Sequence, residues 1–194
     1  MDADTELMVK VAQGDRAAFA VLFDRYQASV CRFTYRFVGD RARAEELAQD
    51  IFIKLYRTAG SYRPAAKFKT YLFKVAANHC LNEVRRGEYK VDHLPQGPGE
   101  EELELASPEG AGPDEALHGR QLEQAVGEAL SKMSERERAA FSMCRFEGMA
   151  YKDIADALFA SEAAVKSLIH RATLAVAKRI SQLQSGELPQ RSRA

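Results

Sequence analysis

Residues 151–180 read YKDIADALFASEAAVKSLIHRATLAVAKRI, and this stretch decides the fold of the C-terminal half of the chain. Ile154, Ala155 and Leu158 predict one face of a short helix, because their spacing follows the helical repeat. Ser161, after a tight turn, is a helix-capping residue and predicts the start of a longer helix. The inward face of that longer helix carries Val165, Leu168, Ile169, Ala172, Val176 and Ile180. A short helix, a tight turn and a long helix form the helix-turn-helix arrangement.

Two further helices precede this motif. Apolar residues at helical spacing mark the first, namely Leu122, Ala125, Val126, Ala129 and Leu130. Ser134 with Glu137 forms a capping box that opens the second helix, which Gly148 ends. The C-terminal half is therefore predicted to be helical throughout.

The N-terminal half is divided into helices by glycine-aspartate pairs, in which glycine stops one helix and aspartate caps the next. These pairs are Gly14-Asp15 and Gly39-Asp40, and Pro64 disfavours helix immediately before it. No segment shows sustained two-residue alternation, so we expect an all-α fold. The predicted helices include one to about Val38, one to about Ala59 and one from about Lys67 to Arg86.

The helical pattern is lost over residues 91–113. Prolines, glycines and the acidic run at 100–102 leave too little apolar surface there to offset the entropy of ordering. We therefore predict two small helical domains, at 1–90 and 114–185, joined by a flexible acidic linker at 91–113. The polar residues 186–194 are predicted to form a disordered tail.

The formal net charge of zero hides a segregation of charge along the chain. Residues 60–90 carry seven basic and two acidic residues, net +5, and residues 162–194 carry six and two, net +4. Residues 91–117 carry eight acidic residues and no basic ones, net −8. Two basic blocks on either side of an acidic spacer predict two contacts with nucleic acid.

The helix predicted over 41–59 presents a mixed face opposite its core. Glu46, Gln49 and Asp50 surround Ile53 on this face, and Arg57 follows. A single exposed apolar residue is common on ordinary surfaces, which is one interpretation. The other is a protein-docking stripe with an apolar centre and a polar rim.

The outward stripe of the helix predicted over 67–86 contains no acidic residue. An ordinary solvated face explains the basic residues but not the lack of acids. Basic groups neutralise phosphate, and Tyr and Asn stack on or bond to exposed bases, so the pattern favours unwound DNA. The stripe consists of Tyr71, Lys74, Asn78, Asn82 and Arg85, and the preceding loop adds Tyr62, Arg63, Lys67, Phe68 and Lys69.

The outward side of the last helix carries small residues among hydrogen-bond donors. Ser167, His170 and Arg171 lie there, with Lys166 on the flank. This pattern fits a recognition helix in a major groove. Helical hairpins of this length also occur in domains that bind no DNA, so both interpretations stay open.

No grouping of residues predicts catalysis, a metal site or a cofactor. The chain lacks a Gly-rich phosphate loop and a nucleophile elbow. Cys31, Cys80 and Cys144 lie far apart, and no histidine has metal-ligand spacing to a cysteine pair. The N-terminus lacks the features of a signal peptide, and no apolar run is long enough to span a membrane. We therefore expect a cytoplasmic protein without membrane insertion.

Four stretches, in order along the chain, resemble the extracytoplasmic-function (ECF) sigma factors of the sigma-70 superfamily. They are DRARAEELAQDIFIKLYR at 40–57, FKTYLFKVAAN at 68–78, FEGMAYKDIA at 146–155 and AVKSLIHRA at 164–172. The resemblance implies an alternative sigma factor that binds core RNA polymerase, recognises the −10 and −35 promoter elements and promotes DNA melting. It implies no cofactor and no enzymatic activity.

The resemblance also implies a role for each surface. The stripe around Ile53 would dock on the polymerase clamp, and the loop at 62–69 with Asn78 would recognise and open the −10 element. The last helix would read the −35 element, while Tyr151 and Lys152 would touch the DNA backbone. The implied partners are the clamp and flap regions of the large polymerase subunits, promoter DNA and an anti-sigma factor.

Several positions depart from the family pattern. The family usually has Trp where Tyr71 stands, Arg where Ala77 stands, Asp where Asn82 stands and Gly-Thr at 163–164. It usually has Gly where Phe159 stands, in the turn of the helix-turn-helix, and a bulky residue at positive φ is strained. These departures imply an outlying subgroup with its own promoter sequence.

Two other functions remain open from the sequence. One is a stand-alone regulator that binds duplex DNA through the helix-turn-helix, with the N-terminal domain as an oligomerisation module. The other is a scaffold or regulatory binding protein without DNA contacts.

Overall fold

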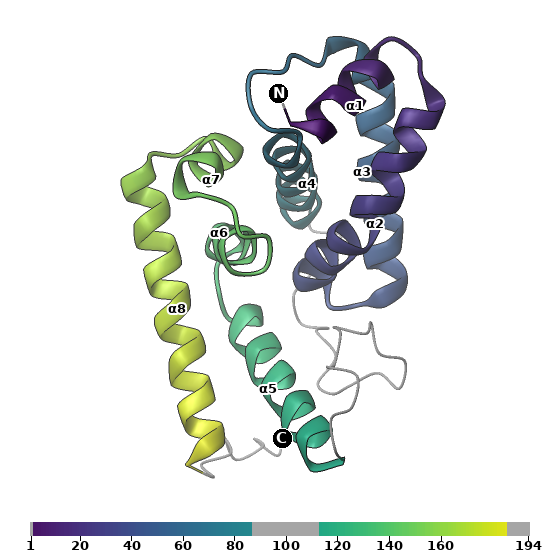
Figure 1. The fold of residues 1–194 in the computed structure, drawn as a ribbon. Helices are drawn as coiled ribbons and strands as arrows, with labels where there is room; N and C mark the ends of the chain where they lie inside the picture. Colours follow the sequence, from purple (N-terminus) through teal and green to yellow (C-terminus); the bar gives the residue numbers. More distant parts are fainter. Residues whose placement is uncertain (1, 87–112, 186–194) are drawn as a thin grey trace.

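The computed structural model describes residues 2–86 and 113–185, and these are helical, with no strand among them (Figure 1). The first group of helices, called here the N-terminal unit, contains α1 to α4. The second group, the C-terminal unit, contains α5 to α8. The elements are α1 (Ala3–Ala12), α2 (Arg16–Val38), α3 (Arg41–Arg57), the short 3-10 helix η1 (Ala59–Ser61), α4 (Phe68–Arg85), α5 (Pro113–Ser131), α6 (Glu135–Arg145), α7 (Tyr151–Leu158) and α8 (Glu162–Gln184).

The predicted stop-and-cap pairs set the helix boundaries of the N-terminal unit. The Asp15 carboxylate accepts a hydrogen bond from the backbone N–H of Ala18 at the start of α2. Gly39 ends α2 in the left-handed conformation, at φ 68°, which glycine adopts without a steric penalty. The Asp40 carboxylate then accepts from the N–H of Arg43 and opens α3. These predictions are confirmed, except that α3 ends at Arg57 and η1 follows it.

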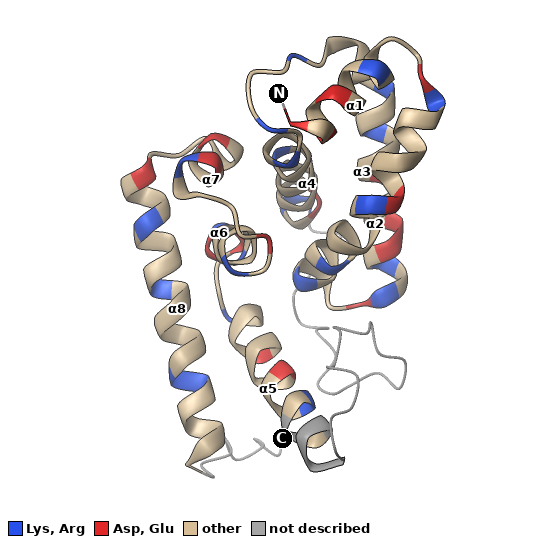
Figure 2. Cartoon of the chain, viewed as in Figure 1, with Lys and Arg blue, Asp and Glu red and all other residues tan. Residues whose placement is uncertain are grey.

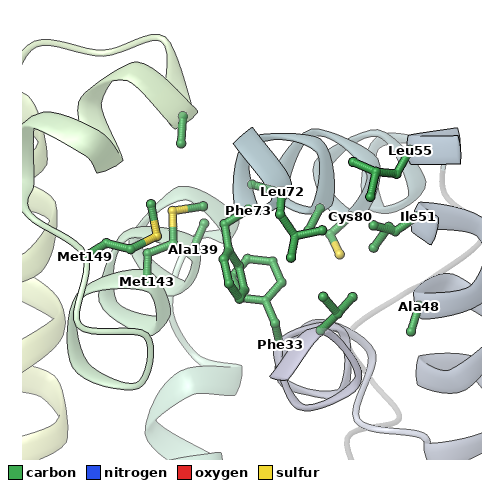
Figure 3. Close-up of a cluster of buried hydrophobic side chains, with 14 of the residues drawn as sticks. Phe33, Ala48, Ile51, Leu55, Leu72, Phe73, Cys80, Ala139, Met143 and Met149 are labelled. Atoms are coloured by element: carbon green, nitrogen blue, oxygen red, sulfur yellow. The ribbon is translucent and has the colours of Figure 1, made fainter. Parts of the chain in front are cut away.

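The core of the N-terminal unit lies where α2, α3 and α4 meet (Figure 3). Phe33 packs edge-on against Phe73 of α4, with ring centroids 5.3 Å apart. The Thr34 hydroxyl donates a 2.8 Å hydrogen bond to the carbonyl of Ala44 and joins α2 to α3. The residues predicted to face inward from α3 are all buried, namely Ala44, Leu47, Ala48, Ile51, Phe52 and Leu55.

The C-terminal unit also follows its local signals. Ser134 and Glu137 form the predicted capping box at the start of α6, and the Ser161 hydroxyl caps α8 by accepting from the N–H of Ala164. Helix α6 ends at Arg145, earlier than predicted, and Gly148 lies in the following loop at φ 62°. The long helices α5 and α8 pack side by side, with α6 and α7 completing the unit (Figure 1).

The two units pack against each other. Helix α7 lies against α4, and α6 lies against both α2 and α4. One continuous cluster of buried side chains includes Phe73 of α4, Met143 of α6 and Met149 of the α6–α7 loop (Figure 3). The predicted linker at 91–113 lies outside the described residues except for Pro113, which begins α5. The predicted tail at 186–194 lies wholly outside them.

Candidate functional site

The docking stripe, consisting of Glu46, Gln49, Asp50 and Ile53, is exposed along one side of α3. Ile53 is 47% exposed, although it is a large apolar residue with buried neighbours on the opposite face of the helix. Arg57 extends the stripe at the end of α3 and is also exposed. The stripe therefore has the apolar centre and charged rim that protein-binding surfaces show.

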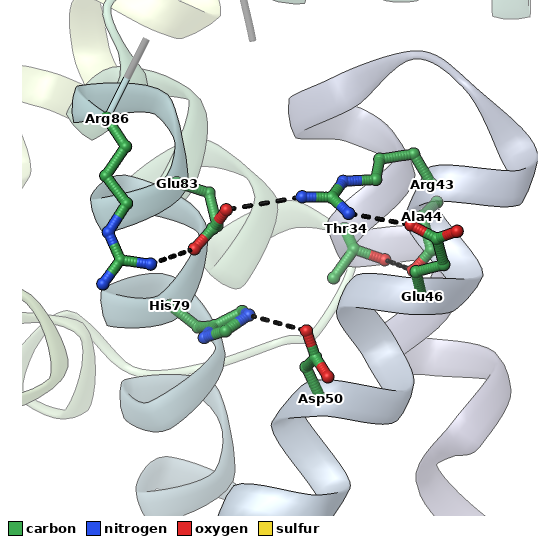
Figure 4. Close-up of polar contacts among 8 residues, drawn as sticks. All are labelled: Thr34, Arg43, Ala44, Glu46, Asp50, His79, Glu83 and Arg86. Carbon is green, nitrogen blue, oxygen red and sulfur yellow. Dashed lines mark hydrogen bonds and ion pairs between the residues drawn. The ribbon is translucent and has the colours of Figure 1, made fainter. Parts of the chain in front are cut away.

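A network of ion pairs holds the upper part of the docking stripe against α4 (Figure 4). Arg43 donates to Glu46 at 2.8 Å and to Glu83 of α4 at 3.4 Å. Glu83 is buried and also accepts a 3.0 Å hydrogen bond from Arg86. A buried carboxylate between two guanidinium groups satisfies its charge without burying an unpaired ion. The network therefore fixes the register of α3 on α4.

Asp50 faces His79 of α4, but the two groups form no strong ion pair at neutral pH. The Asp50 carboxylate lies 3.9 Å from Nε2 of His79, which is at the limit of an ion pair. Burial lowers the pKa of His79 below its ordinary value of 6.5, and this outweighs the opposing effect of Glu83 and Asp50. The imidazole is therefore neutral near pH 7. The exposed Asp50 carboxylate is left available to a cationic partner.

The outward residues of α4 form the second candidate surface, called here the α4 surface. Asn82 and Arg85 are exposed, whereas Tyr71, Lys74 and Asn78 are half-buried. Among the loop residues predicted to join them, Arg63 and Lys67 are exposed. The predicted amphipathic order of the helix is confirmed, since Phe68, Leu72 and Ala76 on the opposite side are buried.

Two aromatic residues of the predicted DNA-binding loop are buried, so the expectation that they offer rings to DNA is wrong for this conformation. The ring of Phe68 is packed against Tyr26, and its backbone N–H donates a 3.0 Å hydrogen bond to the hydroxyl of Thr5. The buried ring of Tyr62 lies 4.9 Å from that of Tyr71, measured between centroids. Both rings anchor the loop to the helices around it.

Lys69 and Lys74 have contacts that the sequence did not predict. The Lys69 ammonium donates a 2.6 Å hydrogen bond to the backbone carbonyl of Glu147 and lies 3.3 Å from its carboxylate. The Lys74 ammonium lies 4.3 Å from the centroid of the Phe159 ring, which is a cation–π distance. Both partners belong to the C-terminal unit, and neither was predicted as a site residue.

The third candidate surface is the outward side of α8, called here the α8 face, which consists of Lys166, Ser167, His170 and Arg171. All four residues are exposed, and basic side chains recur along the helix (Figure 2). Arg171 is paired with Glu137 of α6 at 2.5 Å, which was not predicted. The hydrogen bond from Arg171 lowers the pKa of Glu137. Arg171 of α8 is therefore held against α6.

The turn between α7 and α8 places Phe159, a bulky residue, in the left-handed backbone conformation. Phe159 lies at φ 50° and ψ 50°. Among the described residues, it is the only one other than glycine that has a positive φ. Tyr151 and Lys152, at the start of α7, are exposed on the same unit. The helix-turn-helix therefore forms with a strained aromatic residue at its turn.

A buried arginine in α6 is a further residue that the sequence reasoning missed. The Arg138 guanidinium donates to the carbonyls of Leu130, Ser131 and Met133 at the end of α5. It also donates a 3.1 Å hydrogen bond to the carbonyl of Phe37 in α2. Arg138 therefore closes α5 and joins the two units. Its position gave no local signal, because Phe37 is 101 residues away in sequence.

Neither a metal site nor a membrane-spanning helix is present among residues 2–86 and 113–185. They contain no group of three or more His, Cys, Asp or Glu side chains that could hold a metal ion. None of the described helices has the length and apolar character required to cross a membrane. Among the cysteines, Cys80 is buried, while Cys31 and Cys144 are half-buried, and all three are free thiols.

These features define an all-helical protein of two units, the second of which contains a helix-turn-helix. A model of sigma-70 region 2 matches residues 22–88, and a model of sigma-70 region 4 matches residues 123–176. The RNA polymerase sigma-H factor of Pseudomonas aeruginosa is 32% identical over 185 residues, which cover 94% of this chain and 96% of that one. The chain therefore belongs to the sigma-70 family of RNA polymerase sigma factors, within the ECF type, and has the role of an alternative sigma factor in transcription initiation.

Other relatives agree with this assignment. The ECF RNA polymerase sigma-E factor of Escherichia coli is 29% identical over 185 residues, covering 93% of this chain and 95% of that one. CnrH, solved in complex with the cytosolic domain of CnrY, has a TM-score of 0.69 at 21% identity, over 93% of this chain and 98% of that one. RpoE from Bartonella quintana, solved with the anti-sigma factor NepR, has a TM-score of 0.64 at 20% identity. The match covers 84% of this chain and 96% of that one. The two solved structures show that the fold is shared.

Proposed function

We propose that this sigma factor uses its three surfaces for three successive contacts in initiation. The docking stripe on α3 binds the clamp of core RNA polymerase, with Ile53 as the apolar centre of the contact. The α4 surface captures unstacked bases of the −10 element, and the α8 face reads the −35 element in the major groove. The observation that carries this proposal is the α4 surface, where Lys74, Asn82 and Arg85 follow one another without an acidic residue.

The chemistry of each surface supports its assigned partner. Lysine and arginine neutralise backbone phosphates, while asparagine offers a donor and an acceptor to a base edge. Arg171 has the guanidinium fork that pairs with two acceptors of guanine. Asp50 and Glu46 offer carboxylates to basic groups on a protein partner. Together these surfaces distribute sequence recognition over two units of one chain.

The proposed domain limits are residues 1–90 for the unit that docks and melts, and 114–185 for the unit that reads the −35 element. Residues 91–113 would be the tether between them. Because the two DNA contacts lie on separate units, core polymerase sets their separation and raises the effective concentration of each for its promoter element. Capture of exposed bases drives melting in this scheme, and no nucleotide hydrolysis is needed.

Two further partners belong to this proposal. An anti-sigma factor is bound to RpoE of Bartonella quintana in its solved complex, and we propose a partner of that kind for this chain. The second partner is the flap region of the polymerase, which would hold the C-terminal unit at the −35 element. Sigma factors are not enzymes, and we propose that this one has no catalytic activity and acts in the cytoplasm, where the polymerase is.

The test is a pull-down of core RNA polymerase by the purified chain, followed by run-off transcription on a candidate promoter. The proposal predicts that the chain co-elutes with core enzyme and that the transcript requires both. A stand-alone regulator would bind duplex DNA without polymerase, and the relatives, which match over both units, give that alternative no support. A scaffold would bind polymerase without directing a transcript.

A further inference from the structure

The first turn of α1 contacts the end of the loop that the proposed function assigns to −10 DNA. Helix α1 packs against η1 and α4, the elements on either side of this loop (Figure 1). The Thr5 hydroxyl accepts a 3.0 Å hydrogen bond from the backbone N–H of Phe68, the first residue of α4. Thr5 and Phe68 are both buried, so this hydrogen bond is shielded from water. The contact joins two residues that are 63 positions apart in the sequence.

This hydrogen bond caps α4 from another helix. The first N–H groups of an α-helix have no partner within the helix, and the side chain of the preceding residue commonly accepts from one of them. The residue that precedes α4 is Lys67, which forms no such hydrogen bond, and its ammonium group is a donor only. Helices α1, α2 and α3 are each capped by an aspartate directly before them. Thr5 supplies for α4 the acceptor that Lys67 does not offer.

The Asp2 carboxylate fixes the direction of the Thr5 hydroxyl. One carboxylate oxygen accepts from the backbone N–H of Thr5 at 3.0 Å, and the other accepts from the Thr5 hydroxyl at 2.9 Å. Because the hydroxyl proton points at Asp2, a lone pair of the hydroxyl oxygen is left for the N–H of Phe68. Donation to a charged acceptor polarises the hydroxyl and strengthens it as an acceptor. A chain of hydrogen bonds therefore runs from exposed Asp2 to the buried start of α4.

A second contact from the same turn supports the ring of Phe68. The Tyr26 hydroxyl donates a 2.6 Å hydrogen bond to the Asp4 carboxylate, and the Tyr26 ring lies 5.4 Å from that of Phe68, measured between centroids. Burial and the hydrogen bond to Asp4 raise the pKa of Tyr26, so its hydroxyl stays protonated and donates at neutral pH. The first turn of α1 therefore holds the backbone of Phe68 directly and its ring through Tyr26.

The loop between η1 and α4 depends on its two ends for order. Residues 63–67 are all exposed and carry the cationic side chains Arg63 and Lys67. The flanking residues Tyr62 and Phe68 are buried. An exposed segment has few packing contacts of its own, so the residues at its ends determine how well it is ordered. Loosening of Phe68 would therefore change where Arg63 and Lys67 lie.

We propose that Thr5 is a positioning residue for −10 recognition, which caps α4 from α1 and thereby sets the loop at 62–67 for contact with unwound DNA. The inference rests on the proposed function, because it takes this loop and the α4 surface to be the −10 contact. Thr5 is buried and acts through the N–H of Phe68. Its hydroxyl is the group required, so serine can replace threonine here, whereas valine, which has nearly the same shape, cannot.

Amide hydrogen exchange of the purified full-length chain, measured by NMR, tests the cap. The test variant is Thr5→Val, which removes the hydroxyl. Thr34→Val is the matched control, because Thr34 is also buried and its hydroxyl joins α2 to α3. We expect the Phe68 amide to exchange about fivefold faster in Thr5→Val, the factor that the loss of one cap gives, and at the wild-type rate in Thr5→Ser and Thr34→Val. An unchanged rate in Thr5→Val, or an equal acceleration in Thr34→Val, would overturn the proposal.

Asp2→Asn tests the same hydrogen bonds from their exposed end. The amide oxygen can still accept from the N–H of Thr5, but the amide nitrogen cannot accept from the Thr5 hydroxyl. The Phe68 amide should exchange faster in this variant also, by a smaller factor than in Thr5→Val. Asp15→Asn is the control, because Asp15 caps α2 with a hydrogen bond of the same kind. If Thr5→Val does not fold, equal rates in Asp2→Asn and Asp15→Asn would overturn the proposal.

The effect on DNA is measured with the same variants bound to core polymerase. The probe is the fluorescently labelled non-template strand of a promoter that the wild-type holoenzyme transcribes, and its binding is followed by anisotropy. We expect the Thr5→Val holoenzyme to bind this strand about three- to fivefold more weakly, because fewer molecules have an ordered loop. Thr5→Ser should restore the wild-type affinity, and Thr34→Val should retain it. Unchanged affinity in Thr5→Val, or equal losses in both valine variants, would contradict the positioning role.

The two assays separate this inference from the proposed function. If the wild-type holoenzyme neither transcribes a candidate promoter nor binds its separated strand, the proposed function fails, while the exchange rate of Phe68 still reports on the cap. If the wild-type holoenzyme binds the strand and the Thr5→Val holoenzyme binds it equally well, the positioning role alone is wrong. A pull-down of core polymerase with each variant shows that the holoenzymes are assembled.

Discussion

Replacing Arg138 with methionine should test how the two units are held together. The guanidinium is buried in α6 and donates to four backbone carbonyls, three at the end of α5 and one in α2. Methionine keeps most of the apolar stem but offers no donor. The carbonyl of Phe37 then loses its donor, whereas that of Leu130 keeps only the backbone N–H of Met133.

The expected loss in the free energy of unfolding follows from the burial of the Arg138 guanidinium and its carbonyl partners. A hydrogen bond to a charged group contributes about 1.5–3 kcal/mol, but the guanidinium has also lost its hydration, which offsets part of the total. Burial lowers the pKa of Arg138, which reflects the same cost. A buried carbonyl left without a donor costs about 1–3 kcal/mol, and we therefore expect Arg138→Met to lower the free energy of unfolding by about 2–4 kcal/mol. Since small domains are stable by about 5–15 kcal/mol, this is a large share of the total.

The assay is urea unfolding of the full-length chain, followed by circular dichroism. Arg145→Met is the matched control, because Arg145 is exposed on the same helix and donates to Thr173 at 3.4 Å. We expect it to change the free energy of unfolding by no more than about 0.5 kcal/mol. A loss below about 1 kcal/mol for Arg138→Met would refute the reasoning, because water would then be satisfying the carbonyls as well as the guanidinium does.

Three surface substitutions and one pH dependence give further predictions. Alanine at all three polar positions of the docking stripe should abolish co-elution with core polymerase while the chain stays folded; retained co-elution would exclude the stripe. Arg171→Ala should cost about 1–3 kcal/mol in −35 duplex binding and relax base preference, whereas a uniform loss over all sequences would make it a phosphate contact. Asn78→Ala should impair opening of duplex promoters more than transcription from pre-melted ones, and equal losses would count against melting. The pKa of Glu137 is lower in the folded chain than its ordinary value of 4.5, so its contribution to stability is present above pH 4.5 and is lost as pH falls through the folded value. The difference in unfolding free energy between wild type and Glu137→Gln should therefore shrink from pH 7 to pH 3. A difference that stays constant with pH would contradict this prediction.

The helices could be predicted from the sequence because their signals are local. Asp15 and Asp40 cap helices through hydrogen bonds to residues three positions away, and Ser134 and Ser161 do the same. The apolar spacing then decides which face of each helix is buried. The exposed position of Ile53 followed from the same spacing, since it lies opposite the buried face of α3.

The contact between the units could not be predicted in this way. Lys69 and Glu147 are 78 residues apart, and nothing near either residue indicates the other. The sequence marked Phe159 as unusual because of its place in a turn, but its partner Lys74 lies in the other unit. The lysines were therefore assigned to DNA alone. The structure adds a second set of partners for them.

The most direct test of the central claim is transcription of sheared genomic DNA by core RNA polymerase, with and without the purified chain, followed by mapping of the RNA 5′ ends. The account predicts a new set of 5′ ends, preceded by two sequence elements at a fixed separation, that appears only when chain and core enzyme are combined. The same 5′ ends with core enzyme alone, or new ends without a shared pair of elements, would contradict it.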